Sequence, residues 1–414
     1  MSILSFKDYG GKKNSYPKFL ACWSAFYAMF LLSNVIMFFK KYSLANFHAY
    51  ADLFINYEGG FVRRGLLGQG LLLCYRMGGN PVTIATILSF VAYIIIAIYM
   101  IRNFAKRKYA LGLLTVSYLL GAFGLYGIPV MRRDYMVLCS FLLILWLWRK
   151  MQLSHWLIIG NILACLTILC YEPFVFFSVP LFILITKLKT RSLGKSIIYW
   201  TLPILTFGLC CLYAGGKETY AAIKESTRPF LQSPGVMDFL ARDTSGIMQY
   251  HLTTNFLQID HGIPVVLLSM ISILSMIYFN VNSTILFGGK AEEPNKRRHL
   301  LLIIIYLFIC LSPMFTCLST DYGRTCVYIS ICTFGMYFTL TPQKLNLLFS
   351  NRLNQIADKT LAFIDHYVPP TQGKIMFIML FIGIASWTGI GLRGFLISSQ
   401  VGHYIYTFLL HLIG

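Results

Sequence analysis

Long apolar runs alternate with short polar connections along most of the chain. A helix of about 20 apolar residues can cross the hydrocarbon core of a bilayer, which is roughly 30 Å thick. The pattern predicts eleven spans, at 19–39, 81–101, 109–128, 134–148, 156–171, 173–186, 197–214, 263–281, 299–318, 325–341 and 375–392. A last stretch, 401–413, predicts either a surface helix or a twelfth span. We therefore predict an all-α, polytopic membrane protein with a single membrane domain over residues 1–414.

The region 156–186 admits two interpretations, one long helix centred on Glu172 or two spans that break at Tyr171-Glu172-Pro173. The break places most of the 35 Lys and Arg residues on the side of the N-terminus, whereas an unbroken helix divides them almost evenly. Positive residues favour the cytoplasmic side, and proline interrupts helices. We therefore adopt the break and predict that the N-terminus lies in the cytoplasm.

This topology places two long connections, 40–80 and 215–262, on the external side together with most of the 15 carboxylates. Within the first connection, Gly65 to Tyr75 lies between Arg64 and Arg76 and carries no charge. Eleven helical residues rise only about 16 Å, which is too little to cross the membrane. We expect this segment to enter the membrane as a re-entrant turn or to lie along the interface.

Composition excludes a soluble globular domain, because 57% of the residues are hydrophobic, 12% are charged and the mean hydropathy is +0.67. The net charge of +20 is spread over short clusters between apolar runs, which indicates topology and not a nucleic-acid partner. The eleven cysteines show no CxxC spacing and are predicted to be small apolar side chains of the core. Without a Walker loop or a DxD-like triplet, we expect no cofactor and no metal.

Four mixed clusters of acidic residues and arginines fall at helix ends on the predicted external side. The first consists of Asp52 and of the charged residues in NYEGGFVRRGLLGQGLL (56–72). The others are VMRRDYMV, CYEPFVF and STDYGRT. If the bundle is compact, these clusters converge on one site. Their acidic members, which we consider as catalytic residues, are Asp52, Glu58, Asp134, Glu172 and Asp321. Their arginines, which we consider as binders of a phosphate or lipid head, are Arg63, Arg64, Arg132, Arg133 and Arg324.

Two interpretations of these clusters stand side by side. Charged groups at a membrane boundary can simply pair with one another or with anionic headgroups. Alternatively, the planar guanidinium of arginine binds two phosphate oxygens at once, and a carboxylate beside it can take a proton from an attacking hydroxyl. The second interpretation fits glycosyl transfer from a polyprenyl-phosphate carrier within the lipid bilayer.

The short patterns EGGFVRRG, RRDY, YEPF and DYGR resemble those of Wzy-type repeat-unit polymerases of bacterial surface polysaccharides. The layout of one span, a long acidic external loop and a second long external loop is similar to that of GT-C membrane glycosyltransferases. The resemblance implies an enzyme that polymerises O-antigen or capsule repeat units from polyprenyl-(di)phosphate-linked sugars, with a chain-length regulator as a further partner to consider. It also implies a bacterial inner-membrane location with the active face in the periplasm, and an acidic base at Asp52 or Glu58.

Two alternatives remain open at the level of the sequence. One is a GT-C transferase that adds a single sugar from a polyprenyl-phosphate donor, and the other is a transporter or flippase of a lipid-linked oligosaccharide. Transporters tend to place charges near the membrane midplane on broken helices, whereas the charges here gather at helix ends. For either enzyme, we expect Glu58→Gln and Arg64→Ala each to abolish product while the protein still inserts.

Overall fold

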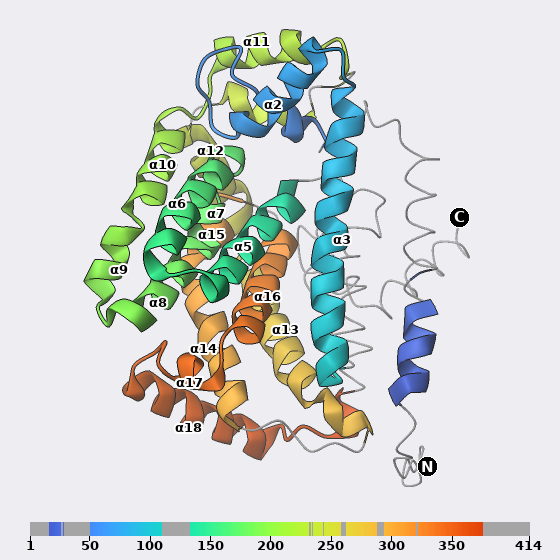
Figure 1. Cartoon of the computed structure of the whole chain (residues 1–414), viewed down its shortest axis with the longest axis vertical. Coiled ribbons are helices and arrows are strands. Elements are labelled where there is room, and N and C mark those ends of the chain that lie inside the picture. The colour runs from blue at the N-terminus through green and yellow to red at the C-terminus, as the bar shows by residue number, and fades with distance from the viewer. Residues whose placement is uncertain are drawn as a thin grey trace.

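The structure is a computed structural model of the 414-residue chain, and it describes residues 16–25, 28, 50–109, 133–231, 233, 235–242, 244–257, 262–287, 294–319 and 322–375. Within these ranges all regular structure is helical and no strand occurs. The predicted all-α class is therefore confirmed. The helices form one elongated bundle, with short helices across both of its ends (Figure 1).

In chain order the helices are η2 (Ala51–Phe54), α2 (Gly65–Arg76), α3 (Pro81–Arg107), α5 (Arg133–Lys150), α6 (Leu153–Cys170), α7 (Phe174–Phe177), α8 (Val179–Thr190), α9 (Leu193–Tyr199), α10 (Thr201–Leu212), α11 (Lys217–Thr227), η3 (Gly235–Ala241), α12 (Thr244–His251), η4 (Leu252–Phe256), α13 (Gly262–Asn282), η5 (Ser283–Phe287), α14 (Pro294–Cys310), α15 (Ser312–Thr316), α16 (Tyr322–Thr339), α17 (Pro342–Asn346) and α18 (Asn351–Tyr367). Helix α3 shows how sequence sets these bounds. The side chain of Asn80 accepts hydrogen bonds from the N–H groups of Val82 and Thr83, and Pro81 occupies the first turn.

Among the described residues, three helical stretches are long and apolar enough to cross a membrane: α3, α6 and the run Gly262–Phe287. The pair α9 and α10, bent by 55°, adds a fourth if it counts as one span. These helices indicate a membrane protein, but the prediction of eleven spans is not confirmed. Of the predicted spans, almost all of 109–128 and of 375–392 lie outside the described residues, as do most of 19–39 and the stretch 401–413.

Several predicted spans are interrupted helices in the structure. Span 173–186 divides into α7 and α8 around Ser178, span 197–214 bends at Trp200, and span 299–318 divides into α14 and α15 at Leu311. Pro180, Pro203 and Pro313 each lie within the first three residues of the helix that follows the interruption. Proline lacks the N–H that would continue the preceding helix, so hydropathy alone overestimates the length of these helices.

The predicted break at Tyr171-Glu172-Pro173 is confirmed. Helix α6 ends at Cys170, and α7 begins at Phe174 with Pro173 as its N-cap. The chain then returns along the bundle, because Lys189 at the end of α8 lies over the ring of Trp148 near the end of α5. Helices α6 and α8 therefore run in opposite directions, and Glu172 lies at a turn between them.

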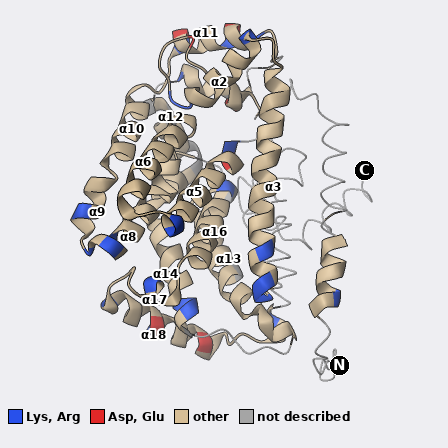
Figure 2. Cartoon of the chain, viewed as in Figure 1, with Lys and Arg blue, Asp and Glu red and all other residues tan. Residues whose placement is uncertain are grey.

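The two long connections meet at one end of the bundle, where α2 and α11 lie together (Figure 1). Residues of 50–76 and 215–240 share a hydrophobic cluster that includes Tyr50, Val62, Ile223 and Met237. Among the described residues, most Lys and Arg side chains lie toward the opposite end of the bundle, where α17 and α18 cross its base (Figure 2). Helix α2 has 12 residues, about 18 Å of rise, and is too short to span a bilayer.

Close packing explains part of the glycine content of the stretch 56–72. A Cβ on Gly68 would lie 2.0 Å from the carbonyl oxygen of Ile55, and one on Gly59 would lie 2.6 Å from the Cα of Thr219. Backbone therefore approaches backbone at both positions, and a side chain cannot be accommodated without movement. Gly70, on the same helix as Gly68, has open space around its Cβ position within the described part of the chain.

We expect Gly68→Ala to destabilise the protein by about 1 to 3 kcal/mol, because the added methyl group must push η2 away from α2. The matched variant Gly70→Ala should leave stability unchanged or raise it by up to about 1 kcal/mol, since alanine favours the helix. The thermal midpoint of the purified protein, followed by size-exclusion chromatography after heating, distinguishes the two. Equal midpoints for both variants would contradict the packing of α2 described here.

Candidate functional site

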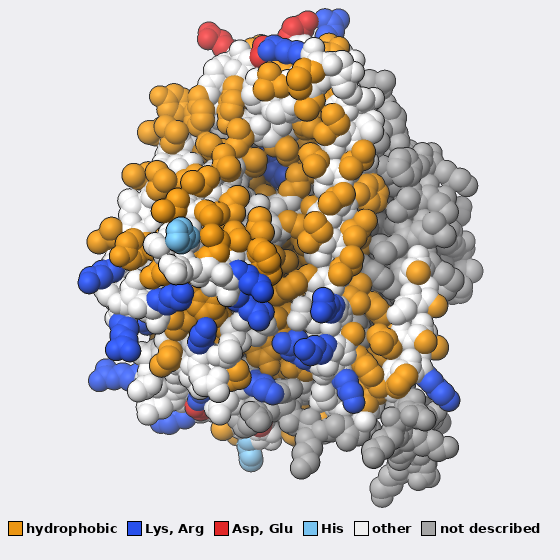
Figure 3. All heavy atoms as spheres, in the orientation of Figure 1, with side chains coloured by type: hydrophobic (Ala, Val, Ile, Leu, Met, Phe, Trp, Pro, Cys, Tyr) orange, Lys and Arg blue, Asp and Glu red, His pale blue; other side chains and the backbone are white. Residues whose placement is uncertain are grey.

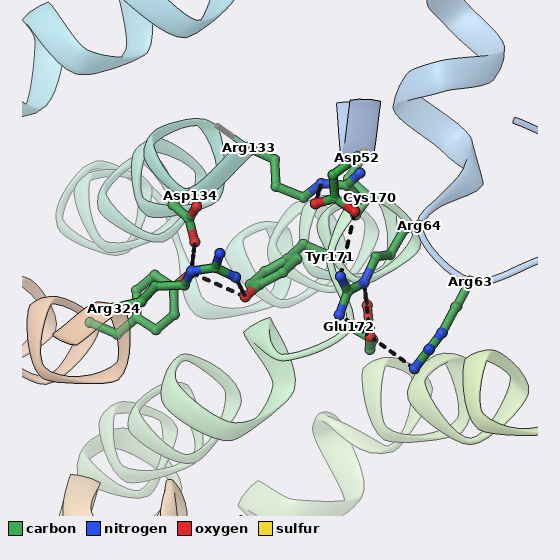
Figure 4. Close-up of polar contacts among 10 residues, drawn as sticks. Asp52, Arg63, Arg64, Arg133, Asp134, Cys170, Tyr171, Glu172 and Arg324 are labelled. Atoms are coloured by element: carbon green, nitrogen blue, oxygen red, sulfur yellow. Dashed lines mark hydrogen bonds and ion pairs between the residues drawn. The ribbon is translucent and has the colours of Figure 1, made fainter. Parts of the chain in front are cut away.

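Seven charged residues from five separate segments form two ion-paired groups that meet at Tyr171, and we call the seven together the Arg-carboxylate cluster (Figure 4). They come from η2, the turn before α2, the start of α5, the turn between α6 and α7, and the start of α16. Its members are Asp52, Arg63, Arg64, Arg133, Asp134, Glu172 and Arg324. All four clusters identified in the sequence therefore contribute to this site, the fourth through Arg324.

Arg64 and Glu172 form the tightest pair of the cluster. The Nε and Nη2 atoms of Arg64 donate to the Glu172 carboxylate at 2.7 to 2.9 Å, and Arg63 Nη1 lies 3.6 Å from the same carboxylate. Such two-point arginine-carboxylate contacts fix orientation as well as charge. Arg64 adopts a left-handed backbone with φ of 65°, a conformation that costs a non-glycine residue about 1 to 2 kcal/mol. The fold thus holds this side chain in place despite a local backbone cost.

Asp52 connects the Arg64 pair to α5. One of its oxygens lies 2.9 Å from Nε of Arg133, and the other lies 3.5 Å from Nη1 of Arg64. Arg133 also donates from Nη1 to the carbonyl oxygen of Cys170, the last residue of α6. Asp52 therefore lies between two arginines that come from different parts of the chain (Figure 4).

Asp134 and Arg324 form the other side of the cluster. Arg324 Nε lies 3.4 Å from the Asp134 carboxylate, which also accepts a hydrogen bond from the hydroxyl of Tyr328. Arg324 Nη1 donates to the hydroxyl of Tyr171 at 3.0 Å, and the guanidinium of Arg64 lies 5.1 Å from the centre of the Tyr171 ring. Tyr171 thus joins the two halves of the cluster.

Charge and burial together indicate an anion site. Among the described residues, four arginines face three carboxylates, a surplus of one positive charge, and the exposed fraction of these side chains runs from 2% for Arg133 to 24% for Arg64. Two N–H groups, Nε of Arg63 and Nη2 of Arg133, are buried without a hydrogen-bond partner among the described residues. Unpaired buried donors of a charged group are costly, and an anionic ligand would satisfy them.

The pKa shifts of Glu172 and Arg64 agree with a permanently charged pair, whereas burial lowers the pKa of Arg63. Burial raises the pKa of Glu172, but Arg64 and Arg63 outweigh it and hold the pKa below its ordinary value. Burial lowers the pKa of Arg64, and the charges of Glu172 and Asp52 outweigh it and hold this pKa well above the usual value. Glu172 is therefore ionised at neutral pH and a poor proton acceptor. Its chemical role is to position Arg64.

Glu58 is not brought into the cluster. Its carboxylate pairs with Arg76 at the end of α2, at 2.8 Å, and both side chains are substantially exposed. Arg132 and Asp321 lie outside the described residues. The sequence did not single out Tyr328, although it lies four residues after Arg324 and therefore on the same face of α16.

The cluster can hold a phosphate group but offers no evident metal site. Among the described residues, no group of three or more His, Cys, Asp or Glu side chains could hold a metal ion. Guanidinium groups from three directions, with Asp52 as the most exposed of the three carboxylates, suit an anionic group beside a proton acceptor. Comparison with known proteins adds no family to this description: no family model, no curated protein and no solved structure matches the chain.

Proposed function

We propose that the protein is a membrane glycan-assembly enzyme that joins polyprenyl-(di)phosphate-linked sugars, with O-antigen or capsule repeat units as its substrates. The observation that carries this proposal is the Arg-carboxylate cluster, with its surplus positive charge and its two unpartnered buried N–H groups. The resemblance of the short sequence patterns to Wzy-type polymerases supplies the reaction class. Positive residues concentrate toward the opposite end of the bundle (Figure 2), which favours a periplasmic location of the cluster.

In the proposed reaction, a hydroxyl of the acceptor sugar attacks the anomeric carbon of the donor sugar. The bond from that carbon to the phosphate oxygen breaks, and the lipid (di)phosphate leaves with both electrons of the bond. The proton of the hydroxyl passes to the Asp52 carboxylate, and the N–H groups of Arg63, Arg64 and Arg133 stabilise the charge on the leaving phosphate. No ATP is consumed.

A liposome assay tests the proposal directly. Purified protein is reconstituted with a fluorescent polyprenyl-diphosphate oligosaccharide, and the products are separated by size. We expect a ladder of products that differ by one repeat unit. A second reaction supplies a polyprenyl-phosphate-linked sugar as donor, and the addition of only one sugar there would indicate a one-sugar transferase. Translocation of the labelled lipid without any new glycosidic bond would indicate a transporter.

A surface-polysaccharide gel of a deletion strain provides the cellular counterpart. Loss of a polymerase should collapse the ladder of chain lengths to one repeat unit, because the lipid-linked units still reach the periplasm but are not joined. A full ladder of altered mobility would indicate a side-branch transferase instead. An unchanged gel would contradict both enzyme hypotheses.

A further inference from the structure

A second feature of the molecule lies at the end remote from the cluster. It is a groove of about 510 Å³ between α3, α5 and α16. Arg133 in the cluster and Arg149 at the groove stand at opposite ends of α5, about 24 Å apart by helical rise. This separation approaches the thickness of a hydrocarbon core, so the groove and the cluster lie near opposite boundaries of a membrane.

The polar part of the groove is basic. Arg102 and Lys106 line it from one face of α3, and Arg149 lines it from the last turn of α5. All three side chains are exposed, and within the described part of the chain no carboxylate lines the groove and none of the three forms an ion pair. Positive charges that line one groove repel each other, and an anion bound among them would offset the repulsion.

The apolar part of the groove consists of exposed side chains of α3 and α5. Ile95, Ile98 and Trp146 line it and expose 51%, 60% and 53% of their surfaces. The exposed apolar stripe continues along α3 through Val91 and Ile87, away from the basic end. Figure 3 shows the same division on this face, with Lys and Arg side chains gathered below a broad apolar surface. A tryptophan between an apolar and a basic zone is typical of a membrane boundary.

We propose that this groove binds an anionic phospholipid of the bilayer. Its phosphate headgroup would lie among Arg102, Lys106 and Arg149, and one acyl chain would lie along Ile98 and Ile95 on α3. The apolar wall and the basic rim fit the two parts of such a lipid, whereas a free phosphate would use only the rim. The proposal is independent of glycosyl transfer, because it concerns the other end of the bundle.

Native mass spectrometry of the full-length protein tests it. The protein is incubated with equal concentrations of phosphatidylglycerol and phosphatidylcholine, and the bound lipids are counted. We expect one phosphatidylglycerol to be retained with at least about tenfold preference. The triple variant Arg102→Gln, Lys106→Gln, Arg149→Gln should lose that preference to within about twofold.

A charge-matched variant and a soluble competitor control the experiment. Lys195, Arg352 and Lys359 are exposed residues outside the groove, and their triple replacement by Gln should preserve the preference. Glycerol 3-phosphate at the same concentration should not displace the lipid. An equal loss in the control variant, or displacement by glycerol 3-phosphate, would overturn the proposal: the first would indicate a general charge effect, and the second a simple anion site.

Discussion

Replacing Arg64 by alanine should abolish product formation and destabilise the protein by about 3 kcal/mol. Among the described residues, the variant leaves Glu172 with Arg63 at 3.6 Å as its remaining ion-pair partner, and a nearly buried carboxylate that loses its closest partner is strongly destabilising. Loss of a positioned donor to the leaving phosphate should lower turnover by at least about 100-fold. The liposome assay measures the turnover, and thermal unfolding of the purified protein measures the stability.

The double variant Arg64→Ala, Glu172→Gln separates the structural role of Arg64 from its chemical role. It removes one charge of each sign, so the cluster keeps its surplus of one positive charge and no carboxylate is stranded. We expect most of the lost stability to return while product remains absent. If activity returned together with stability, Arg64 would be a structural residue only, and the phosphate would have to be held by the other arginines.

The meeting of distant charges at one site could be predicted from the sequence, but their pairing could not. Mixed clusters at helix ends on one predicted side must approach each other once the helices pack, and ion pairs do join Asp52, Glu172 and Asp134 to arginines of other segments. Which acid meets which arginine depends on turns that periodicity does not describe. Arg64, for example, reaches Glu172 from a left-handed turn that is rare for arginine.

Glu58 is a second case in which the ion-pair partner could not be predicted from the sequence. It precedes Arg63 and Arg64 by only a few residues, and the sequence made it, with Asp52, a candidate for the acidic base. In the structure, the chain before α2 folds back along that helix. The ring of Tyr57 packs against Gly65, and the backbone N–H of Tyr57 donates to the side-chain oxygen of Gln69. The reversal directs Glu58 to Arg76, so neighbours in sequence lie at different ends of α2.

Asp52 is therefore the carboxylate on which the proposed chemistry depends most. We expect Asp52→Asn to lower turnover by at least about 100-fold, because the amide cannot take the proton of the acceptor hydroxyl. The amide oxygen can still accept from Arg133, so the thermal midpoint should fall by only a few degrees. The matched variant Glu58→Gln was expected from the sequence to abolish product, but in the structure it breaks only an exposed ion pair, worth at most about 1 kcal/mol, and we now expect it to keep turnover within about twofold. Both are measured in the liposome assay, and the opposite result, an active Asp52→Asn with an inactive Glu58→Gln, would move the base out of the Arg-carboxylate cluster.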